Sequence, residues 1–383
     1  MKAIAKTRPE AGVELIDVPE PQVGPGSVKV RLEAASVCGT DLHIYSWDEW
    51  AAKRIQPPRI IGHEFCGTIV EVGPGVVDRQ VGDFVASESH ITCGVCRQCR
   101  LGLGHVCVNT RILGVDVDGG FAPFVVIPKD NAQPISRSIP PKIASFLDAF
   151  GNAVHTVNAG PVLDQKVLIT GMGPIGMFAA AVCKAEGASL VAATEISDFR
   201  AGLARQMGAD AVLDPRRDDL EAALRELAPE GFDAVLEMSG SPAALDLAVR
   251  SVRPGGRLSL LGVYKESRQS VDMNALVFGG VEVQGIVGRR LWETWVQMRG
   301  LLERGAVDLE PVVTHELPYT EFAYGMELMK KGEGRQGRVP IRRGGVSERP
   351  EGKARLVQSL REARRSPLQR VRRHQARNRT PVL

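Results

Sequence analysis

Four of the seven cysteines lie within fifteen residues of one another, at Cys93, Cys96, Cys99 and Cys107. Gaps of two, two and seven residues separate them, a clustering that favours metal binding over a disulfide framework. Short loops of this length let neighbouring thiolates converge on one ion, and four sulfur ligands form the closed tetrahedral shell of a structural zinc site. We therefore predict a structural zinc ion here. Cys66 and Cys183 are expected to pack in the core.

A second set of metal-binding residue types is spread over the first 150 residues. It comprises Cys38 in VCGTDLH, His63 and Glu64 in GHEFCG, and Asp148. Each residue alone is also typical of an ordinary buried or surface position. Together they supply a thiolate, an imidazole and carboxylates, a set that can hold a catalytic zinc ion and leave one coordination position for a substrate.

A glycine pattern predicts a dinucleotide-binding loop. Gly171, Gly173 and Gly176 follow an apolar segment and open a predicted helix, so the loop can approach a pyrophosphate closely at a helix N-terminus. Glu195 ends the next strand about 20 residues further on, where a ribose hydroxyl is expected. A carboxylate there repels a 2′-phosphate, which favours NAD over NADP. Arg200 is either a surface cation or a stacking or ribose contact.

The elements that must position these residues change in type along the chain. Short apolar segments predict strands at 28–32, 67–72, 84–86 and 124–127, and so a compact β-rich domain. After residue 151 strands and helices alternate, which is typical of a parallel sheet covered on both faces. We expect strands there at 167–170, 190–194, 211–213, 234–238, 258–261 and 281–286, and helices at 174–185, 201–207 and 292–303.

The composition, with 44% hydrophobic and 24% charged residues, is that of a globular protein and excludes a fibrous chain. The formal net charge of +3 is too small to indicate nucleic-acid binding by the whole chain. Residues 342–383 contain thirteen Lys and Arg against three Asp and Glu, a net +10, and the rest of the chain carries −7. We expect this basic extension to be disordered. With no recognisable signal peptide or membrane span, we expect a cytoplasmic protein.

These motifs resemble the zinc-dependent medium-chain alcohol dehydrogenase family over about residues 1–341. Further markers are CGTDLHIYSWDEWA from Cys38, GNAVHTV from Gly151 and GRRLWETW from Gly288, which most resemble the members that oxidise L-threonine. The resemblance implies an α/β fold: a β-rich GroES-like catalytic domain at 1–150 and 287–341, and a Rossmann doubly wound parallel-sheet domain that binds NAD at 151–286.

The resemblance also implies roles for individual residues. Thr40 and His43 match a proton relay, His90 matches a histidine near the substrate, and Cys38, His63, Glu64 and Asp148 match the region of the catalytic zinc, with either Asp148 or a water as its last ligand. Pro174 and Ile175 join the three glycines, Glu195 and Arg200 in the NAD site. Two zinc ions per subunit, a homotetramer, and oxidation of L-threonine to 2-amino-3-oxobutanoate by NAD are implied.

Three features leave alternatives open. Ala149 replaces a common Pro and Val287 stands where an aromatic is frequent, and both positions bear on the local shape of the substrate and cofactor pocket. The same chemistry on a polyol or 2,3-butanediol is an alternative. The basic extension has no counterpart at the usual end of the family. An alternative of another class is therefore a protein that binds nucleic acid or acidic surfaces through this extension, which lacks interleaved aromatics and any reader motif.

Overall fold

The computed structural model describes residues 1–330 and 340–342, the last three by their backbone alone. The described residues form one compact unit. Apart from Arg342, the basic extension and its predicted disorder lie outside the described residues. Within residues 1–330, no helix has the length and apolar character needed to cross a membrane.

The β-rich part is built around a curled, mainly antiparallel sheet. Its strands follow the order β10-β6-β5-β3-β18-β17, and β9 also pairs with β3. The bounds are β3 (Ser27–Ser36), β5 (Glu64–Val72), β6 (Phe84–Ser87), β9 (Phe124–Pro128), β10 (Ala132–Pro134), β17 (Leu317–Pro318) and β18 (Pro340–Arg342). The four strands predicted in this part are confirmed as β3, β5, β6 and β9.

Two smaller sheets accompany this one. One has the order β2-β1-β4, with β1 (Lys2–Lys6), β2 (Glu14–Asp17) and β4 (Arg59–Ile60). The other pairs β7 (His90–Ile91) with β8 (Arg111–Ile112). The β7–β8 pair joins the two ends of the segment that carries the four clustered cysteines, so this segment forms a lobe of its own.

The second part is a parallel sheet in the order β13-β12-β11-β14-β15-β16. The bounds are β11 (Lys166–Thr170), β12 (Leu190–Thr194), β13 (Ala211–Leu213), β14 (Phe232–Glu237), β15 (Val252–Leu260) and β16 (Glu282–Gly285). Apolar runs such as those of β11 and β12 suit strands that are buried on both faces. The order reverses between β11 and β14, and in such sheets ligands bind at the carboxyl ends of the strands beside this reversal.

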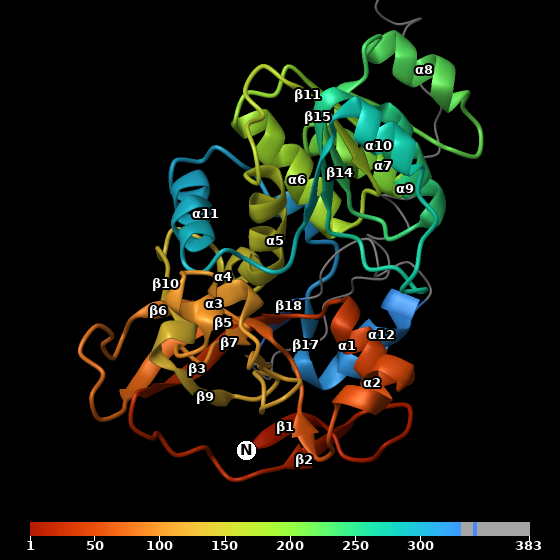
Figure 1. Ribbon diagram of the computed structural model, residues 1–383. Helices are drawn as coiled ribbons and strands as arrows, with labels where there is room; N and C mark the ends of the chain where they lie inside the picture. Colours follow the sequence, from red (N-terminus) through yellow and green to blue (C-terminus); the bar gives the residue numbers. More distant parts are fainter. Residues whose placement is uncertain (331–339, 343–383) are drawn as a thin grey trace, which may run out of the picture. The chain divides into compact units, whose positions relative to one another are not determined.

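Helices cover the parallel sheet and connect it to the β-rich part (Figure 1). Those following its strands are α6 (Pro174–Ala185), α7 (Asp198–Gln206), α8 (Leu220–Leu227), α9 (Pro242–Ser251) and α10 (Met273–Gly279). Helix α5 (Leu147–Val157) packs on α6 and on α11 (Glu293–Glu303). The predicted domain limit at residue 150 falls inside α5. The domain limits remain predictions.

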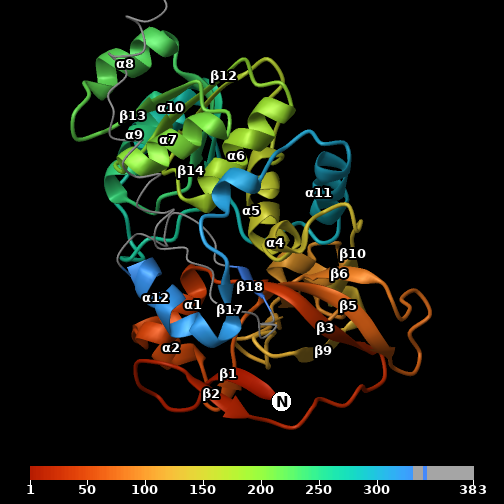
Figure 2. The ribbon, with the colours of Figure 1, turned by 180° about the vertical axis from the view of Figure 1, so that it is seen from behind.

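The remaining helices belong to the β-rich part. They are α1 (Gly39–Ser46), α2 (Glu49–Arg54), α3 (Arg97–Arg100), α4 (Pro141–Ala144) and α12 (Phe322–Lys330). Figure 2 shows α1, α2 and α12 side by side, as in the view from the front, although α12 begins about 280 residues after α1. The predicted α/β class, with a β-rich part and a doubly wound parallel sheet, is confirmed.

One apolar cluster runs from the β-rich part into the parallel sheet. Phe178 of α6 stacks on Phe146 and meets Phe150 of α5 edge to face, with ring centroids 5.3 and 5.7 Å away. All three rings are fully buried. Cys66 and Cys183 lie in the same cluster, which confirms their expected packing role.

Candidate functional site

Strand register brings three of the predicted metal ligands together. Strands β3 and β5 are antiparallel, and Ser36 of β3 lies opposite Glu64 of β5. The chain continues from Ser36 to Cys38, which precedes α1, while His63 immediately precedes Glu64. The ligand atoms of Cys38, His63 and Glu64 all lie within 4.8 Å of one another. A thiolate, an imidazole and a carboxylate converging in this way fit a catalytic zinc ion, which keeps a position for substrate.

Asp41 contacts two members of this group, Cys38 and His63. Its side chain is fully buried, and its Oδ2 accepts a hydrogen bond of 2.9 Å from the backbone N–H of Cys38. Its Oδ1 lies 3.9 Å from Nδ1 of His63, the ring nitrogen on the side away from Cys38. This distance is too long for a hydrogen bond, but a carboxylate on this side of the ring is the usual neighbour of the second nitrogen of a metal-binding imidazole. Sequence reasoning missed Asp41, although its spacing of three residues from Cys38 is that of a capping box.

Asp148 is not part of this group. One of its oxygens accepts the backbone N–H of Ser89 at 3.0 Å, and the other accepts an N–H of Arg289 at 2.8 Å. It does line the same cleft as the three ligands. The structure therefore brings Cys38, His63 and Glu64 together and directs the Asp148 carboxylate toward Arg289.

The four clustered cysteines converge in their lobe. The sulfur atoms lie within 4.8 Å of one another, and no disulfide forms in the described chain, where all seven cysteines lie. Hydrogen bonds from Asn109 and from backbone N–H groups lower the pKa of Cys93 to about 6, whereas burial and neighbouring sulfurs raise the pKa of Cys99 to about 12. Sulfurs this close repel one another once ionised, so the group fits a divalent cation held by four thiolates.

Both parts of the chain line one cleft of about 940 Å³. The β-rich part contributes the three ligands together with Thr40, His43, His90 and Asp148. The parallel-sheet part contributes Pro174, Ile175 and Arg200 at the start of α6 and α7. The predicted relay residues, the predicted substrate histidine and part of the predicted cofactor site thus face a common space.

Thr40 and His43 lie on α1, three residues apart and therefore on the same side of the helix. Nδ1 of His43 makes a short contact with Oδ2 of Asp48, a partner that the sequence did not reveal. The other oxygen of Asp48 accepts the N–H of Ala51 at 3.0 Å and caps α2. Burial tends to raise the pKa of Asp48, but the Ala51 N–H and His43 hold it below its ordinary value.

The glycine loop has the backbone shape that its sequence predicts. Gly171 has a φ of +91°, which favours glycine, and Gly173 precedes the first residue of α6. A Cβ atom at Gly176 would lie 2.2 Å from the carbonyl oxygen of Gly171. These constraints hold the loop against the N-terminus of α6, where an anionic pyrophosphate is stabilised.

Glu195 is tied to this loop. Its Oε2 accepts the N–H of Met172 at 3.1 Å, and its Oε1 accepts the N–H of Ser197 at 2.8 Å. Arg200 forms an ion pair with Oε1 at 2.5 Å. The predicted ribose carboxylate and the cation beside it are therefore partners of one another, and Arg200 is more than a surface cation.

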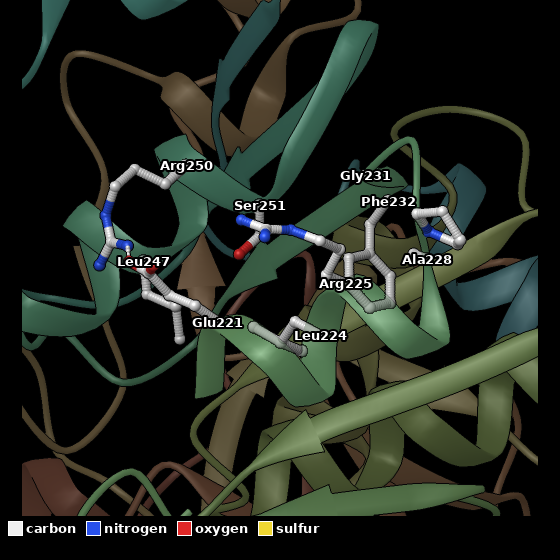
Figure 3. Close-up of a pocket in the computed structure, with 10 residues that line it drawn as sticks. Glu221, Leu224, Arg225, Ala228, Gly231, Phe232, Leu247, Arg250 and Ser251 are labelled. Carbon is white, nitrogen blue, oxygen red and sulfur yellow. Dashed lines mark hydrogen bonds and ion pairs between the residues drawn. The ribbon is translucent and has the colours of Figure 1, made fainter. Parts of the chain in front are cut away.

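A second pocket, of about 280 Å³, lies between α8, α9 and the first residue of β14 (Figure 3). Leu224, Phe232 and Leu247 line it, and an ion pair between Glu221 and Arg250 lies at its rim. It is at the amino end of β14, whereas the glycine loop follows the carboxyl end of β11. It contains none of the predicted site residues.

We expect Cys96→Ser to remove one zinc ion per chain, because three thiolates no longer close the tetrahedral shell of the lobe. The matched control is Cys183→Ser. It changes a buried thiol of the core that belongs to neither of the two metal-ligand groups. Elemental analysis of the purified variants should give one zinc per chain for Cys96→Ser and two for the control. Two zinc ions in Cys96→Ser would refute this assignment.

We expect Gly176→Ala to weaken NAD binding by about 10-fold or more, since its Cβ displaces the Gly171 backbone from the loop geometry. Gly202→Ala on α7 is the control, because a Cβ atom there meets nothing within 4 Å. A fluorescence titration with NADH gives both dissociation constants. Equal affinities for Gly176→Ala and the control would contradict the role of the loop.

Comparison with known proteins agrees with this geometry. Residues 24–137 match the alcohol dehydrogenase GroES-like domain, and residues 174–304 match the zinc-binding dehydrogenase domain. The L-threonine 3-dehydrogenase of Pyrococcus abyssi is 48% identical over 336 residues, which cover 87% of this chain and 96% of that protein. That of Shewanella frigidimarina is 42% identical, with coverages of 87% and 97%.

Solved structures show the same architecture. An alcohol dehydrogenase from Thermus sp. ATN1 superposes with a TM-score of 0.83 and 28% identity, covering 90% of this chain and 100% of that one. An alcohol dehydrogenase from Escherichia coli CFT073, solved with NADH, also gives a TM-score of 0.83, with 27% identity and coverages of 89% and 99%. The cleft combines the Cys38, His63 and Glu64 group with the start of α6, and a separate lobe brings four thiolates together. With these features and these relatives, the chain belongs to the zinc-dependent medium-chain alcohol dehydrogenase family.

Proposed function

We propose that this protein oxidises the secondary alcohol of L-threonine to 2-amino-3-oxobutanoate and reduces NAD to NADH. The observation that carries the proposal is the single cleft lined by Cys38, His63 and Glu64 on one side and by the start of α6 on the other. Relatives at 42–48% identity over most of the chain are L-threonine 3-dehydrogenases, which supports the substrate. Zinc and NAD are the cofactors of this chemistry.

Each cofactor supplies one chemical function. When bound by Cys38, His63 and Glu64, zinc supplies a Lewis acid that lowers the pKa of the substrate hydroxyl. When bound at the glycine loop, NAD supplies the acceptor for the hydride that leaves C3 of the substrate. The protein's own residues have to bind the substrate and take up its hydroxyl proton. They also have to hold C3 of the substrate close to the hydride-accepting carbon of NAD.

Thr40 and His43 provide the route for the proton. A hydroxyl can accept one proton while it donates another, so Thr40 can pass the substrate's proton onward to His43. The Nδ1 contact with Asp48 orients the neutral His43 ring so that its Nε2 is the accepting nitrogen. The side chain of His43 is 58% exposed, and it can therefore release the proton to water.

A homotetramer and a cytoplasmic location complete the proposal. Strand β16 ends the order of the parallel sheet, so its outer edge offers backbone groups to another chain. Next to it along the chain, α10 exposes Met273, Val277 and Phe278. These exposed apolar side chains support a contact between subunits at this edge. The cytoplasmic location remains a prediction from the sequence.

The initial rate with L-threonine and NAD tests the substrate. We expect NADH absorbance to rise with L-threonine and to rise much more slowly with butane-2,3-diol or a polyol. Treatment with a chelator should abolish the rate, and added zinc should restore it. A higher kcat/KM for the diol than for L-threonine would overturn the substrate assignment while leaving the family unaffected.

Asp48→Asn tests the relay. We expect kcat for L-threonine to fall about 10-fold, equal to about 1.4 kcal/mol, because an amide no longer fixes the His43 ring as an anionic acceptor does. Asn remains a good N-cap, so α2 is retained. The control is Glu49→Gln, which changes the neighbouring carboxylate that pairs with Lys53. Equal kcat values for the two variants would exclude Asp48 from the relay.

A further inference from the structure

Arg289 is a buried cation in the wall of the cleft. Its side chain is 1% exposed, and it lies in the segment between β16 and α11. Its Nε donates to Oε2 of Glu88 at 2.9 Å, and its Nη2 makes a short contact with Oε1 of the same carboxylate. Burial tends to raise the pKa of Glu88, but the Arg289 guanidinium overcomes this and holds it far below its ordinary value. The pair is thus a bidentate ion pair without contact to bulk water.

The same guanidinium reaches His90. Nη2 of Arg289 lies 2.6 Å from Nδ1 of His90. A guanidinium has only donors, so the ring nitrogen at this distance has to accept. Oε1 of Glu88 lies 3.2 Å from the same Nδ1, and this contact alone would favour a proton on Nδ1. The shorter contact, with Arg289, determines the tautomer of His90. A proton on Nδ1 would point at the N–H group of Arg289, and two donors cannot form a hydrogen bond.

Other donors already satisfy the Glu88 carboxylate. Oε1 accepts the backbone N–H of His90 at 2.8 Å, and Oε2 accepts the indole N–H of Trp295 at 2.8 Å. Together with the two contacts from Arg289, these leave Glu88 no need of a proton from the His90 ring. The neutral His90 ring therefore carries its proton on Nε2.

The backbone of Gly288 keeps this ring in place. Gly288 has a φ of +57°, and a Cβ atom there would lie 3.1 Å from Cε1 of His90. Its carbonyl group accepts a hydrogen bond of 2.9 Å from His155 on α5. The ring of His90 is thus packed against Gly288 and held at Nδ1. Within the described residues, Nε2 has no hydrogen-bond partner, and His90 lines the cleft.

We infer that Arg289 is a positioning residue that holds His90 as the Nε2–H tautomer, so that His90 donates a hydrogen bond to the carboxylate of the substrate. The choice of the carboxylate rests on the proposed function. L-Threonine offers an ammonium, a hydroxyl and a carboxylate; the ammonium has only donors, and the hydroxyl is assigned to the zinc ligands. The carboxylate remains as the acceptor for the Nε2–H group.

The two histidines of the cleft then have opposite tautomers. Nδ1 of His43 faces the carboxylate of Asp48, which can only accept, so the neutral ring has a bare Nε2. Nδ1 of His90 faces a guanidinium, which can only donate, so that ring has a protonated Nε2. One histidine is set to receive a proton, and the other is set to donate a hydrogen bond without losing its proton.

Neutron crystallography of the deuterated holoenzyme, loaded with zinc and NAD, tests the tautomer directly. We expect a deuteron on Nε2 of His90 and none on Nδ1. A deuteron on Nδ1 alone would overturn the inference. This measurement needs neither a variant nor turnover, so it stands even if L-threonine proves not to be the substrate.

Kinetics test the consequence. Arg289→Lys keeps a positive charge beside Glu88, but an ammonium cannot reach Glu88 and His90 with the geometry of the guanidinium fork. We expect KM for L-threonine to rise about 10- to 100-fold, and kcat/KM for butane-2,3-diol, which has no carboxylate, to fall by a clearly smaller factor. Trp295→Phe is the control, since it removes a donor to Glu88 but leaves the Arg289 contact with His90 intact. It should lower stability without the rise in KM.

Two further variants separate a donor role from a packing role. The amide nitrogen of Gln can take the place of Nε2, whereas that of Asn takes the place of Nδ1. We therefore expect His90→Gln to retain more affinity for L-threonine than His90→Asn. An unchanged KM in Arg289→Lys, or the reverse order of the two His90 variants, would overturn the inference. If the wild-type enzyme fails to oxidise L-threonine, the proposed function fails and the tautomer is still decided by neutron diffraction.

Discussion

The buried ion pair between Glu88 and Arg289 is the constraint on which the cleft depends. It joins side chains 201 residues apart in the sequence, one after β6 and one before α11. Leaving one charge of a buried ion pair without its partner costs several kcal/mol of folding free energy. The segment that carries Arg289 therefore has to pack against the residues that connect β6 and β7. This packing brings Gly288 against His90 and Arg289 against Asp148. The substrate side of the cleft is thereby built from segments about 200 residues apart in the chain.

Two independent rules of sheet geometry place the remaining groups. In the β-rich part, the antiparallel register of β3 and β5 brings Cys38 beside His63 and Glu64. In the second part, the reversal of strand order between β11 and β14 leaves the glycine loop at the carboxyl edge of the sheet. Helix α5 and the apolar cluster around Phe178 connect the two parts. The metal ligands and the dinucleotide loop consequently open onto the same cleft.

Carboxylates around this cleft have different tasks because their neighbours differ. Glu64 lies beside a thiol and an imidazole and fits a metal. Asp148 lies beside a guanidinium and forms an ion pair, Asp48 orients His43, and Glu195 holds the glycine loop together with Arg200. The residue type alone therefore does not assign the role. The role of each carboxylate depends on the groups that lie within hydrogen-bond distance of it.

Features that are local in the chain follow from the sequence alone: the close spacing of Cys93 and its three partners, the glycine pattern from Gly171 to Gly176, and the alternation of strands and helices. Short loops and regular periodicity fix such features without distant contacts, so predicted elements such as α6, β11 and β12 match the structure. The Arg289 contacts of Asp148 and His90 exist only in the folded chain, and the contact of His43 with Asp48 depends on how the turn between α1 and α2 folds back. Arg289 and Glu88 carry no local motif, because their roles arise from charges that meet only when distant segments fold together and exclude water.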